Sequence, residues 1–294
     1  MSKLFNLLDL VGNTPLVEIK NLNPNPNVKI YGKLEGDNPG GSVKDRAAKN
    51  MIECAIQRGE LKPGMKLIEA TSGNTGIALA MIARLYDIEI ELAMPANSTR
   101  ERVLTMEAFG AHVTLTESIE SARDYAVEKA ASGEFFLLNQ FENPDNYLAH
   151  YKTTGPEIYR DTQGQVTHFV SSMGTTGTIM GTSMFLKEQN PAIQIVGCQP
   201  TDGSKIPGIR RWPIEYRPKI YDPSRVDRVM DISEADATAM TQALAKVEGV
   251  FGGMSSGGAV LASLRLATEL EEGVIVCIIC DRGDRYLSSG LFGE

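Results

Sequence analysis

Short apolar runs and helical periodicities alternate along the first half of the chain. The expected strands are 16–20, 28–34, 66–70, 88–94, 111–116 and 135–139, and the expected helices are 43–57, 74–86, 98–110 and 118–131. Strands that are separated by helices are typical of a parallel sheet with helices on its faces. The pattern therefore predicts an α/β fold.

The alternation resumes in the second half, after a polar, turn-rich stretch at residues 141–146. The expected helices are 146–159, 178–189, a helix that begins at 233, and 258–270, and the expected strands are 167–172, 194–199, 227–232 and 274–280. Residues 201–221 are rich in proline and arginine, and we expect them to be irregular. A chain of 294 residues is long enough for two lobes, and 141–146 is the candidate boundary.

Composition narrows the class of protein. Hydrophobic residues make up 42% of the chain and charged residues 22%, as in soluble globular enzymes. The formal net charge of -8 argues against a nucleic-acid-binding protein. No apolar run approaches the ~20 residues that cross a membrane, and residues 1–5 do not open a signal peptide. We therefore expect a cytosolic protein that binds neither nucleic acid nor membrane.

The stretch 38–46, Asn-Pro-Gly-Gly-Ser-Val-Lys-Asp-Arg, places a lysine at the start of a helix. Ser42 is an expected N-cap residue, and Asp45 would complete a weak capping box. Lys44 then lies in the first helical turn, where the positive pole of the helix disfavours its ammonium form. A neutral amine can attack a carbonyl and form a Schiff base. The alternative is an ordinary solvated lysine, and this stretch alone leaves both readings open.

A glycine-rich loop at residues 172–178, Ser-Met-Gly-Thr-Thr-Gly-Thr, lies between an expected strand and an expected helix. Free N–H groups at a helix start form an anion site, and glycines let a phosphate approach the backbone. No Gly-x-Gly triplet occurs in the chain and no lysine follows Gly177, so the common nucleotide motifs are absent. The loop suits one compact phosphate of a different cofactor, and an ordinary turn is the alternative.

Two further loops carry clustered hydroxyl groups. Residues 71–76, Thr-Ser-Gly-Asn-Thr-Gly, place four polar side chains beside a helix start and would suit the carboxylate of an amino acid. The alternative there is a helix cap followed by a polar turn. Residues 252–258 present adjacent hydroxyls at Ser255 and Ser256, which alone are weak evidence of a site.

The cysteines and histidines do not predict a metal or redox site. Cys277 and Cys280 form a C-x-x-C pair, but the surrounding run is an expected strand. Residues three apart on a strand point to opposite faces, so the two sulfurs would not meet. The three histidines share no ligand spacing with each other or with the cysteines.

Four motifs, in this order along the chain, resemble those of the O-acetylserine sulfhydrylase family of pyridoxal-phosphate enzymes: residues 42–46, 71–76, 174–178 and 255–258. Residues 11–16, Val-Gly-Asn-Thr-Pro-Leu, are similar to the opening of that family's sequences. Residues 207–213 and 280–288 are similar to its B isoform, whereas the A isoform has Pro-Ser where Cys280 and Asp281 stand. The resemblance spans nearly the whole chain.

The resemblance implies the two-lobed fold-type II architecture, with mostly parallel sheets flanked by helices and pyridoxal 5'-phosphate between the lobes. The small lobe would comprise residues 37–144, the large lobe residues 1–36 and 145–294, and the protein would be a homodimer. Lys44 would hold the cofactor as a Schiff base and then take the Cα proton of the substrate. The other implied roles are phosphate binding by Gly174, Thr175, Thr176, Gly177 and Thr178, contact with the ring hydroxyl by Asn74 and with the ring nitrogen by Ser255, and binding of the substrate carboxylate by Thr71, Ser72, Thr75 and Gln140.

The implied reaction replaces the acetate of O-acetylserine by sulfur, giving cysteine from sulfide or S-sulfocysteine from thiosulfate. Arg210 and Arg211 lie in an irregular loop of an acidic chain, and a guanidinium suits the oxygens of thiosulfate. A structural or solvated pair is the alternative. Cys280 lies at the C-terminal end of an expected strand, where α/β sheets bind ligands, and its small thiol would leave room for the larger sulfur donor.

Two kinds of alternative remain. A serine or threonine dehydratase or a cystathionine β-synthase would share this fold and cofactor. A non-catalytic module that binds phosphorylated ligands, or that docks a partner in its cleft, is the alternative from another class. An intact Lys44 argues against a purely binding role.

Overall fold

Helices and strands alternate along the chain in the order that the hydrophobic pattern predicts. The computed structural model describes residues 6–71 and 73–293. The strands are β1 (Leu16–Glu18), β2 (Val28–Leu34), β3 (Lys66–Ala70), β4 (Ile90–Pro95), β5 (His112–Thr116), β6 (Phe135–Leu137), β7 (His168–Ser172), β8 (Gln194–Pro200), β9 (Arg228–Ile232) and β10 (Gly273–Ile279). The α-helices are α1 (Lys44–Gln57), α2 (Asn74–Leu85), α3 (Arg100–Ala108), α4 (Ile119–Ala131), α5 (Pro144–Lys152), α6 (Thr154–Asp161), α7 (Gly177–Gln189), α8 (Glu234–Glu248) and α9 (Met254–Ala267). Short 3-10 helices are η1 (Leu7–Leu10), η2 (Glu35–Asp37), η3 (Ile214–Tyr216), η4 (Pro223–Arg225) and η5 (Gly283–Ser289).

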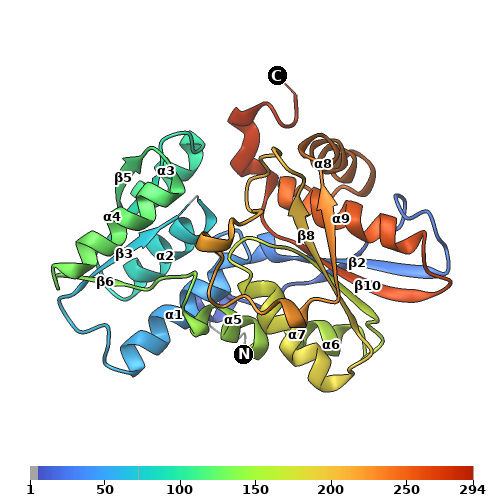
Figure 1. Cartoon of the computed structure of the whole chain (residues 1–294), viewed down its shortest axis with the longest axis horizontal. Helices are drawn as coiled ribbons and strands as arrows, with labels where there is room; N and C mark the ends of the chain where they lie inside the picture. Colours follow the sequence, from blue (N-terminus) through green and yellow to red (C-terminus); the bar gives the residue numbers. More distant parts are fainter. Residues whose placement is uncertain (1–5, 72, 294) are drawn as a thin grey trace, which may run out of the picture.

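In the described part of the chain, the strands form two sheets, one in the order β1-β2-β10-β7-β8-β9 and one in the order β5-β4-β3-β6 (Figure 1). Neighbouring strands in them are parallel, with β1 antiparallel to β2. Parallel neighbours need long crossover connections, which is why helices lie on the faces of both sheets. The predicted α/β fold with mostly parallel sheets is confirmed.

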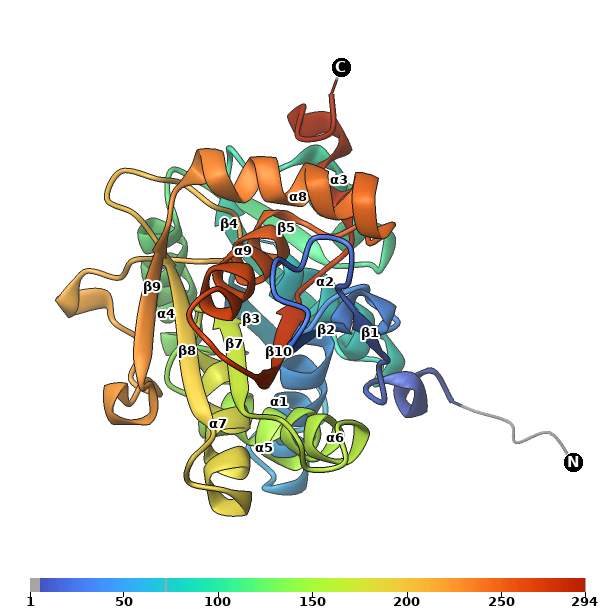
Figure 2. The same ribbon diagram turned by 90° about the vertical axis from the view of Figure 1, so that its right-hand side faces the viewer.

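Helices cover both faces of the larger sheet (Figure 2). Ile275 and Cys277 of β10 pack with residues of α8 and α9, whereas Val276 and Ile278 pack with residues of α6 and α7. Alternate residues of β10 therefore enter opposite cores, as the period of a strand requires. Cys277 lies in the first core, Cys280 lies beside the second, and both thiols are free. The prediction that the two sulfurs do not meet is confirmed.

The smaller sheet also has helices on both faces. Leu67 and Leu92 pack with residues of α1 and α2, and Ile68 and Ala93 pack with residues of α4. Helix α1 contacts both α2 and α5, so the helix that begins at Lys44 lies between the smaller sheet and the helices of the larger one. The residue boundaries of the two lobes stay a prediction.

Two helices differ from expectation. The expected helix 146–159 is interrupted after Lys152 and forms two helices, α5 and α6. The interruption arises because Pro156 has no N–H to donate to the carbonyl of Lys152. Helix α9 begins at Met254 and not at 258. A Cβ at Gly257 would lie 2.1 Å from Oγ1 of Thr241 in α8, so the glycine permits the close approach of these two helices.

Candidate active site

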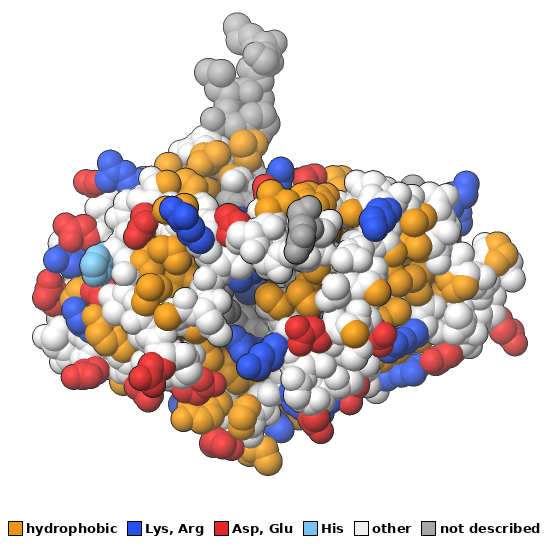
Figure 3. Space-filling model, turned by 90° about the horizontal axis from the view of Figure 1, so that it is seen from above, with side chains coloured by type: hydrophobic (Ala, Val, Ile, Leu, Met, Phe, Trp, Pro, Cys, Tyr) orange, Lys and Arg blue, Asp and Glu red, His pale blue; other side chains and the backbone are white. Residues whose placement is uncertain are grey.

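The loops that follow β3, β7 and β10 meet at a cleft between the two sheets. They carry the 71–76 motif, the 172–178 motif and Cys280. Figure 3 shows this face of the molecule hollowed, with basic side chains at the margin of the hollow. The carboxyl ends of parallel strands are where open α/β sheets bind ligands. The innermost part of the cleft is lined by residues of several motifs, among them Lys44, Asn74, Thr75, Gln140, Gly174 and Thr175.

Lys44 is the first residue of α1, and the structure corrects how this helix starts. Oγ of Ser42 accepts a hydrogen bond from the Lys44 N–H at 3.2 Å, but the expected capping box does not form. The carboxylate of Asp45 instead accepts from the N–H of Gly40 in the preceding turn. The N–H of Val43 donates to the Cys280 carbonyl at 2.8 Å, which fixes the start of α1 to the end of β10.

Burial lowers the pKa of Lys44 below its ordinary value, against the opposing influence of Cys280, Asp281 and Glu35. The sequence predicts the same direction from the pole of the helix alone, whereas removal from water is the main cause in the structure. A neutral amine at the bottom of the cleft is a nucleophile and a base.

A buried ion network holds the first turn of α1. The Arg46 guanidinium contacts Glu35 and Glu157, each at 2.7 Å, and all three side chains are buried. Burial acts to raise the pKa of Glu35, but Arg46 overcomes it and the pKa falls to about 2. These buried charges compensate one another, so Arg46 anchors the helix that presents Lys44.

The loop after β7 has the features of a phosphate site. Thr176, immediately before α7, adopts a left-handed backbone with φ 72°, and its Oγ1 is buried without a hydrogen bond to the described residues. A Cβ at Gly174 would lie 2.6 Å from the Gly208 carbonyl oxygen, and one at Gly177 would lie 2.0 Å from Oδ1 of Asn146. The loop therefore packs too closely for side chains at these glycines, and it offers an unused hydroxyl beside the start of a helix.

Neighbours on the side of the larger sheet fix this loop. The Arg210 N–H donates to the Met173 carbonyl at 2.9 Å, and Nε1 of Trp212 donates to the Gly174 carbonyl at 2.7 Å. Nδ2 of Asn146 contacts Oγ1 of Thr175 at 3.2 Å. The sequence does not single out Trp212 or Asn146 for these roles, because nothing local to either residue indicates the distant loop it contacts.

His150 lies behind the same loop. Its Nε2 is 3.3 Å from Oγ1 of Thr178, and its Nδ1 is 2.8 Å from Oγ1 of Thr154. Burial, with a smaller effect of Arg46, lowers the pKa of His150 to about 3. The ring is therefore neutral at ordinary pH, and it supports the loop through hydrogen bonds and not through charge.

The 71–76 loop is held by one of its own hydroxyls and by side chains from other parts of the chain. Oγ1 of Thr71 accepts from the N–H groups of Gly73 and Gly76, each at 3.1 Å, so this hydroxyl shapes the loop. Oγ1 of Thr75 donates to Oε1 of Gln140 at 2.7 Å, and both residues line the cleft. Ser72, the fourth residue expected to bind the substrate carboxylate, lies outside the described residues.

Ser255 and Cys280 lie close together, but neither is among the residues that line the innermost part of the cleft. Ser255 is buried in the first turn of α9, and its carbonyl accepts from Oγ of Ser172 at 2.7 Å. Burial raises the pKa of the Cys280 thiol to about 11, although a hydrogen bond with Ser255 acts in the opposite direction. Cys280 is therefore a neutral, partly buried thiol.

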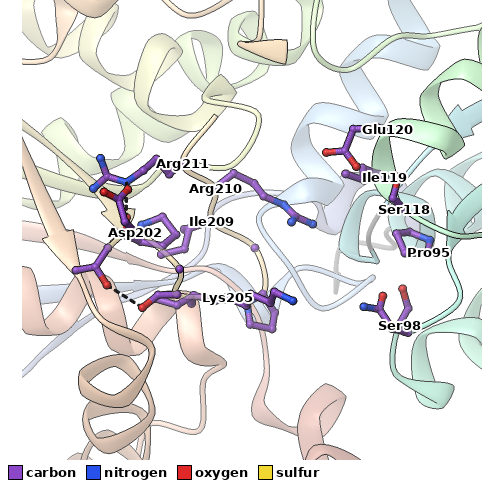
Figure 4. Close-up of a pocket in the computed structure, with 18 of the residues that line it drawn as sticks. Pro95, Ser98, Ser118, Ile119, Glu120, Asp202, Lys205, Ile209, Arg210 and Arg211 are labelled. Atoms are coloured by element: carbon purple, nitrogen blue, oxygen red, sulfur yellow. Dashed lines mark hydrogen bonds and ion pairs between the residues drawn. The ribbon is translucent and has the colours of Figure 1, made fainter. Parts of the chain in front are cut away.

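The two neighbouring arginines point in different directions (Figure 4). The guanidinium of Arg211 contacts Asp231 at 2.7 Å and Asp202 at 3.1 Å, which holds it on the larger-sheet side. Arg210 extends across the cleft and lines its inner part together with Arg102 of α3. The sequence does not single out Arg102, whose Cζ lies 4.9 Å from the centroid of the Tyr286 ring.

Comparison with known proteins assigns the family. The family model described as pyridoxal-phosphate dependent enzyme matches residues 7–281. The chain belongs to this family. Cysteine synthase B of Pseudomonas aeruginosa is 58% identical over 289 residues, covering 97% of each chain, and that of Escherichia coli is 58% identical over 287 residues, covering 97% of this chain and 95% of its own. The crystal structure of cysteine synthase from Entamoeba histolytica superposes with a TM-score of 0.93 at 39% identity, covering 99% of this chain and 91% of that one.

The predicted resemblance and the predicted cofactor are both confirmed by these matches. The side chains of the cleft also fit pyridoxal phosphate, independently of these matches. A buried lysine amine, an unpartnered Thr176 hydroxyl and a glycine loop at the start of α7 offer groups for the aldehyde and the phosphate. The individual cofactor contacts of Asn74, Ser255 and the 174–178 loop stay predictions.

Proposed function

We propose that this protein is a cysteine synthase, which converts O-acetylserine and sulfide into cysteine and acetate. The observation that carries the proposal is the placement of the buried Lys44 amine in one cleft with the 172–178 loop and the 71–76 loop. The relatives named cysteine synthase B support the choice of substrates. In the reaction a C–S bond forms at the substrate Cβ, the C–O bond to acetate breaks, and no oxidant is needed.

When bound, pyridoxal phosphate supplies an electron-withdrawing ring that stabilises charge at the substrate Cα. Lys44 takes the proton from Cα, because burial favours the neutral amine that can accept it. Ser255 would place a neutral hydroxyl, and not a carboxylate, at the ring nitrogen of the bound cofactor. The weaker electron demand that results favours loss of a leaving group at Cβ over transamination.

The smaller-sheet side binds the amino acid. Thr75 and Gln140 line the cleft next to the start of α2, and the positive pole of a helix start suits the substrate carboxylate. Closure of the 71–76 loop over the substrate would exclude water from the cleft. Thr71 contributes by holding the loop in shape.

Colour and covalent labelling test the proposal. The purified protein is expected to be yellow with pyridoxal phosphate, and borohydride is expected to fix the cofactor on Lys44. Lys44→Ala should release no acetate from O-acetylserine and should not be labelled. Lys49→Ala is the matched control, because Lys49 lies on the same helix with its Nζ on the Leu8 carbonyl, 2.8 Å away. Acetate release by Lys44→Ala would contradict the mechanism.

The same experiment separates the related enzyme classes by their products. A serine or threonine dehydratase would release ammonia and a keto acid, and a cystathionine β-synthase would need homocysteine. Cysteine formation that depends on sulfide, without ammonia release, is the expected result. A protein that binds the cofactor without converting any of these substrates would support the non-catalytic alternative.

Thiosulfate is proposed as a second sulfur donor, with S-sulfocysteine and acetate as products. Arg210 carries this proposal because it lines the inner cleft and Figure 4 shows it extending across the opening. A guanidinium can donate to the sulfonate oxygens of thiosulfate, whereas sulfide offers none. The small Cys280 thiol at the end of β10 is expected to leave room for the larger donor.

Arg210→Ala is expected to lower kcat/KM for thiosulfate about tenfold, because one hydrogen bond to a charged group is lost. The kcat/KM for sulfide should change little. Arg211→Ala is the matched control, since the structure holds Arg211 on Asp231 and Asp202. Initial rates at saturating O-acetylserine measure both. Equal losses with the two donors in Arg210→Ala would show that the loop is structural.

Two properties complete the proposal. A homodimer is expected, and sedimentation or light scattering of the holoenzyme measures it. No helix in the described part of the chain could cross a membrane, and recovery of the protein with the cytosolic fraction is the expected result of cell fractionation. A monomer, or a protein found with membranes, would contradict the respective expectation.

A further inference from the structure

Asn74 is held by two partners that together fix the direction of its side-chain amide. Its Nδ2 donates to Oδ2 of Asp281 at 2.7 Å, and its Oδ1 accepts from Nη1 of Arg285. A guanidinium has only donors and a carboxylate has only acceptors, so the amide cannot turn around without losing both bonds. Asp281 and Arg285 therefore fix the positions of the nitrogen and the oxygen of the Asn74 amide.

Both partners are themselves fixed. Asp281 is 1% exposed, and the hydroxyl of Tyr286 donates to the same Oδ2 at 2.7 Å. The backbone of Asp281 pairs with that of Ser42, and Nη2 of Arg285 donates to the carbonyl of Gly40. Segment 281–286 thus connects the start of α1, which carries the lysine, with the start of α2.

The Asn74 nitrogen carries two hydrogens, and Asp281 uses one of them. The second is left for a ligand in the cavity that Asn74 and Lys44 line together. We propose that Asp281 and Arg285 are positioning residues that hold Asn74 so that this second N–H meets the ring oxygen of the cofactor. The proposal rests on the function proposed above. A hydrogen-bond donor at the ring oxygen stabilises the unprotonated form of that oxygen. Asp281 and Arg285 would therefore influence, through Asn74, whether the ring oxygen is protonated.

The absorbance of the bound cofactor, measured over a pH series, tests the proposal. Asp281→Ala and Arg285→Ala are expected to reduce the yellow form with an unprotonated ring oxygen and to move its titration midpoint by about one pH unit, the loss of one ordinary hydrogen bond. Arg282→Ala is the matched control, because Arg282 is an exposed arginine of the same segment that pairs with Asp284. Titrations of the 281 and 285 variants that coincide with the control would overturn the proposal.

The reciprocal exchange Asn74→Asp with Asp281→Asn separates positioning from stability. The amide at position 281 would donate to the carboxylate at position 74, and Arg285 would keep its acceptor, so the connection between the helices is restored. Position 74 would then have no N–H for the ring oxygen. The double variant is expected to unfold near the wild-type temperature and Asn74→Asp alone at a lower one, while both keep a shifted spectrum. A wild-type spectrum in the double variant would overturn the proposal.

Failure of the proposed function gives a different result. A wild-type protein that stays colourless with pyridoxal phosphate would refute that function. A yellow wild type whose titration is unchanged in Asn74→Ala would refute the positioning role alone and leave the function standing.

Discussion

The two walls of the cleft are held in place differently. On the side of the larger sheet, the 172–178 loop is fixed by Trp212 and by Asn146 and His150 of α5, all of which lie outside the loop. On the side of the smaller sheet, Oγ1 of Thr71 holds the N–H groups of Gly73 and Gly76 within the loop, and Asn74 and Thr75 at its end contact Asp281, Arg285 and Gln140. The phosphate loop is thus held by side chains from outside it, whereas a hydroxyl of its own shapes the start of the 71–76 loop, and we expect the substrate side to move more readily.

The largest expected effect is on the wall that carries the phosphate loop. A Cβ at Gly177 would lie 2.0 Å from Oδ1 of Asn146, whose Nδ2 also holds the carbonyl of Gln140 at 2.7 Å. Gly177→Ala should therefore displace the loop and weaken pyridoxal phosphate binding by about 100-fold, the loss of two charge-assisted hydrogen bonds at ~1.5 kcal/mol each. Titration of the apoprotein with the cofactor measures this affinity. Unchanged affinity would show that the phosphate lies elsewhere.

The same wall is expected to make stability depend on pH through His150. Its folded pKa of about 3 lies below the unfolded value, so the stabilisation is present above pH 6.5 and is lost as the pH falls toward 3. Between pH 6.5 and 5, the free energy of unfolding should fall by about 2 kcal/mol from this group. His150→Gln should remove that decrease in urea unfolding of the holoenzyme, and the exposed His112→Gln should not. Equal slopes in the two variants would contradict the account.

The other wall is expected to respond more weakly. A Cβ at Gly76 would lie 2.7 Å from Cγ2 of Thr71 and 2.8 Å from Cε of Met106, and the methionine end is flexible. Gly76→Ala should keep the cofactor and raise the KM for O-acetylserine about tenfold, since part of one carboxylate contact is lost. Loss of yellow colour in Gly76→Ala as complete as in Gly177→Ala would remove the distinction between the walls.

Sequence predicts the parts of the site that local patterns encode. Lys44, the 174–178 loop and the 71–76 loop each stand at a helix start with a characteristic composition, and the structure brings them to one cleft. The α/β fold follows from the same alternation of apolar runs and helical periods. The expected capping box failed because the carboxylate of Asp45 binds the preceding turn, a choice that depends on the buried packing around Gly40.

The supporting residues could not be predicted in this way. His150, Asn146, Asp281 and Arg285 act on groups that lie far from them in the sequence, as with the bond from Asn74 to Asp281. Their polar side chains are common in loops and helices, so composition gives no sign of a buried partner. The different directions of Arg210 and Arg211 likewise could not be predicted, because Arg211 is held by Asp231 of β9, which is distant in the sequence.

The smallest expected effect concerns a contact across the two walls. Glu101 of α3 accepts from the backbone N–H of Ser288 at 3.0 Å and from its Oγ at 2.7 Å. This contact joins the smaller-sheet side to η5, but it is exposed, and its hydrogen bonds compete with water. Ser288→Ala removes one of the two bonds and should raise the KM for O-acetylserine about threefold, with kcat unchanged, because closure over the substrate loses ~0.6 kcal/mol. Ser289→Ala is the matched control, since its Oγ donates within the segment to the Tyr286 carbonyl at 2.6 Å. A threefold rise in both variants, or in neither, would show that closure does not use this contact.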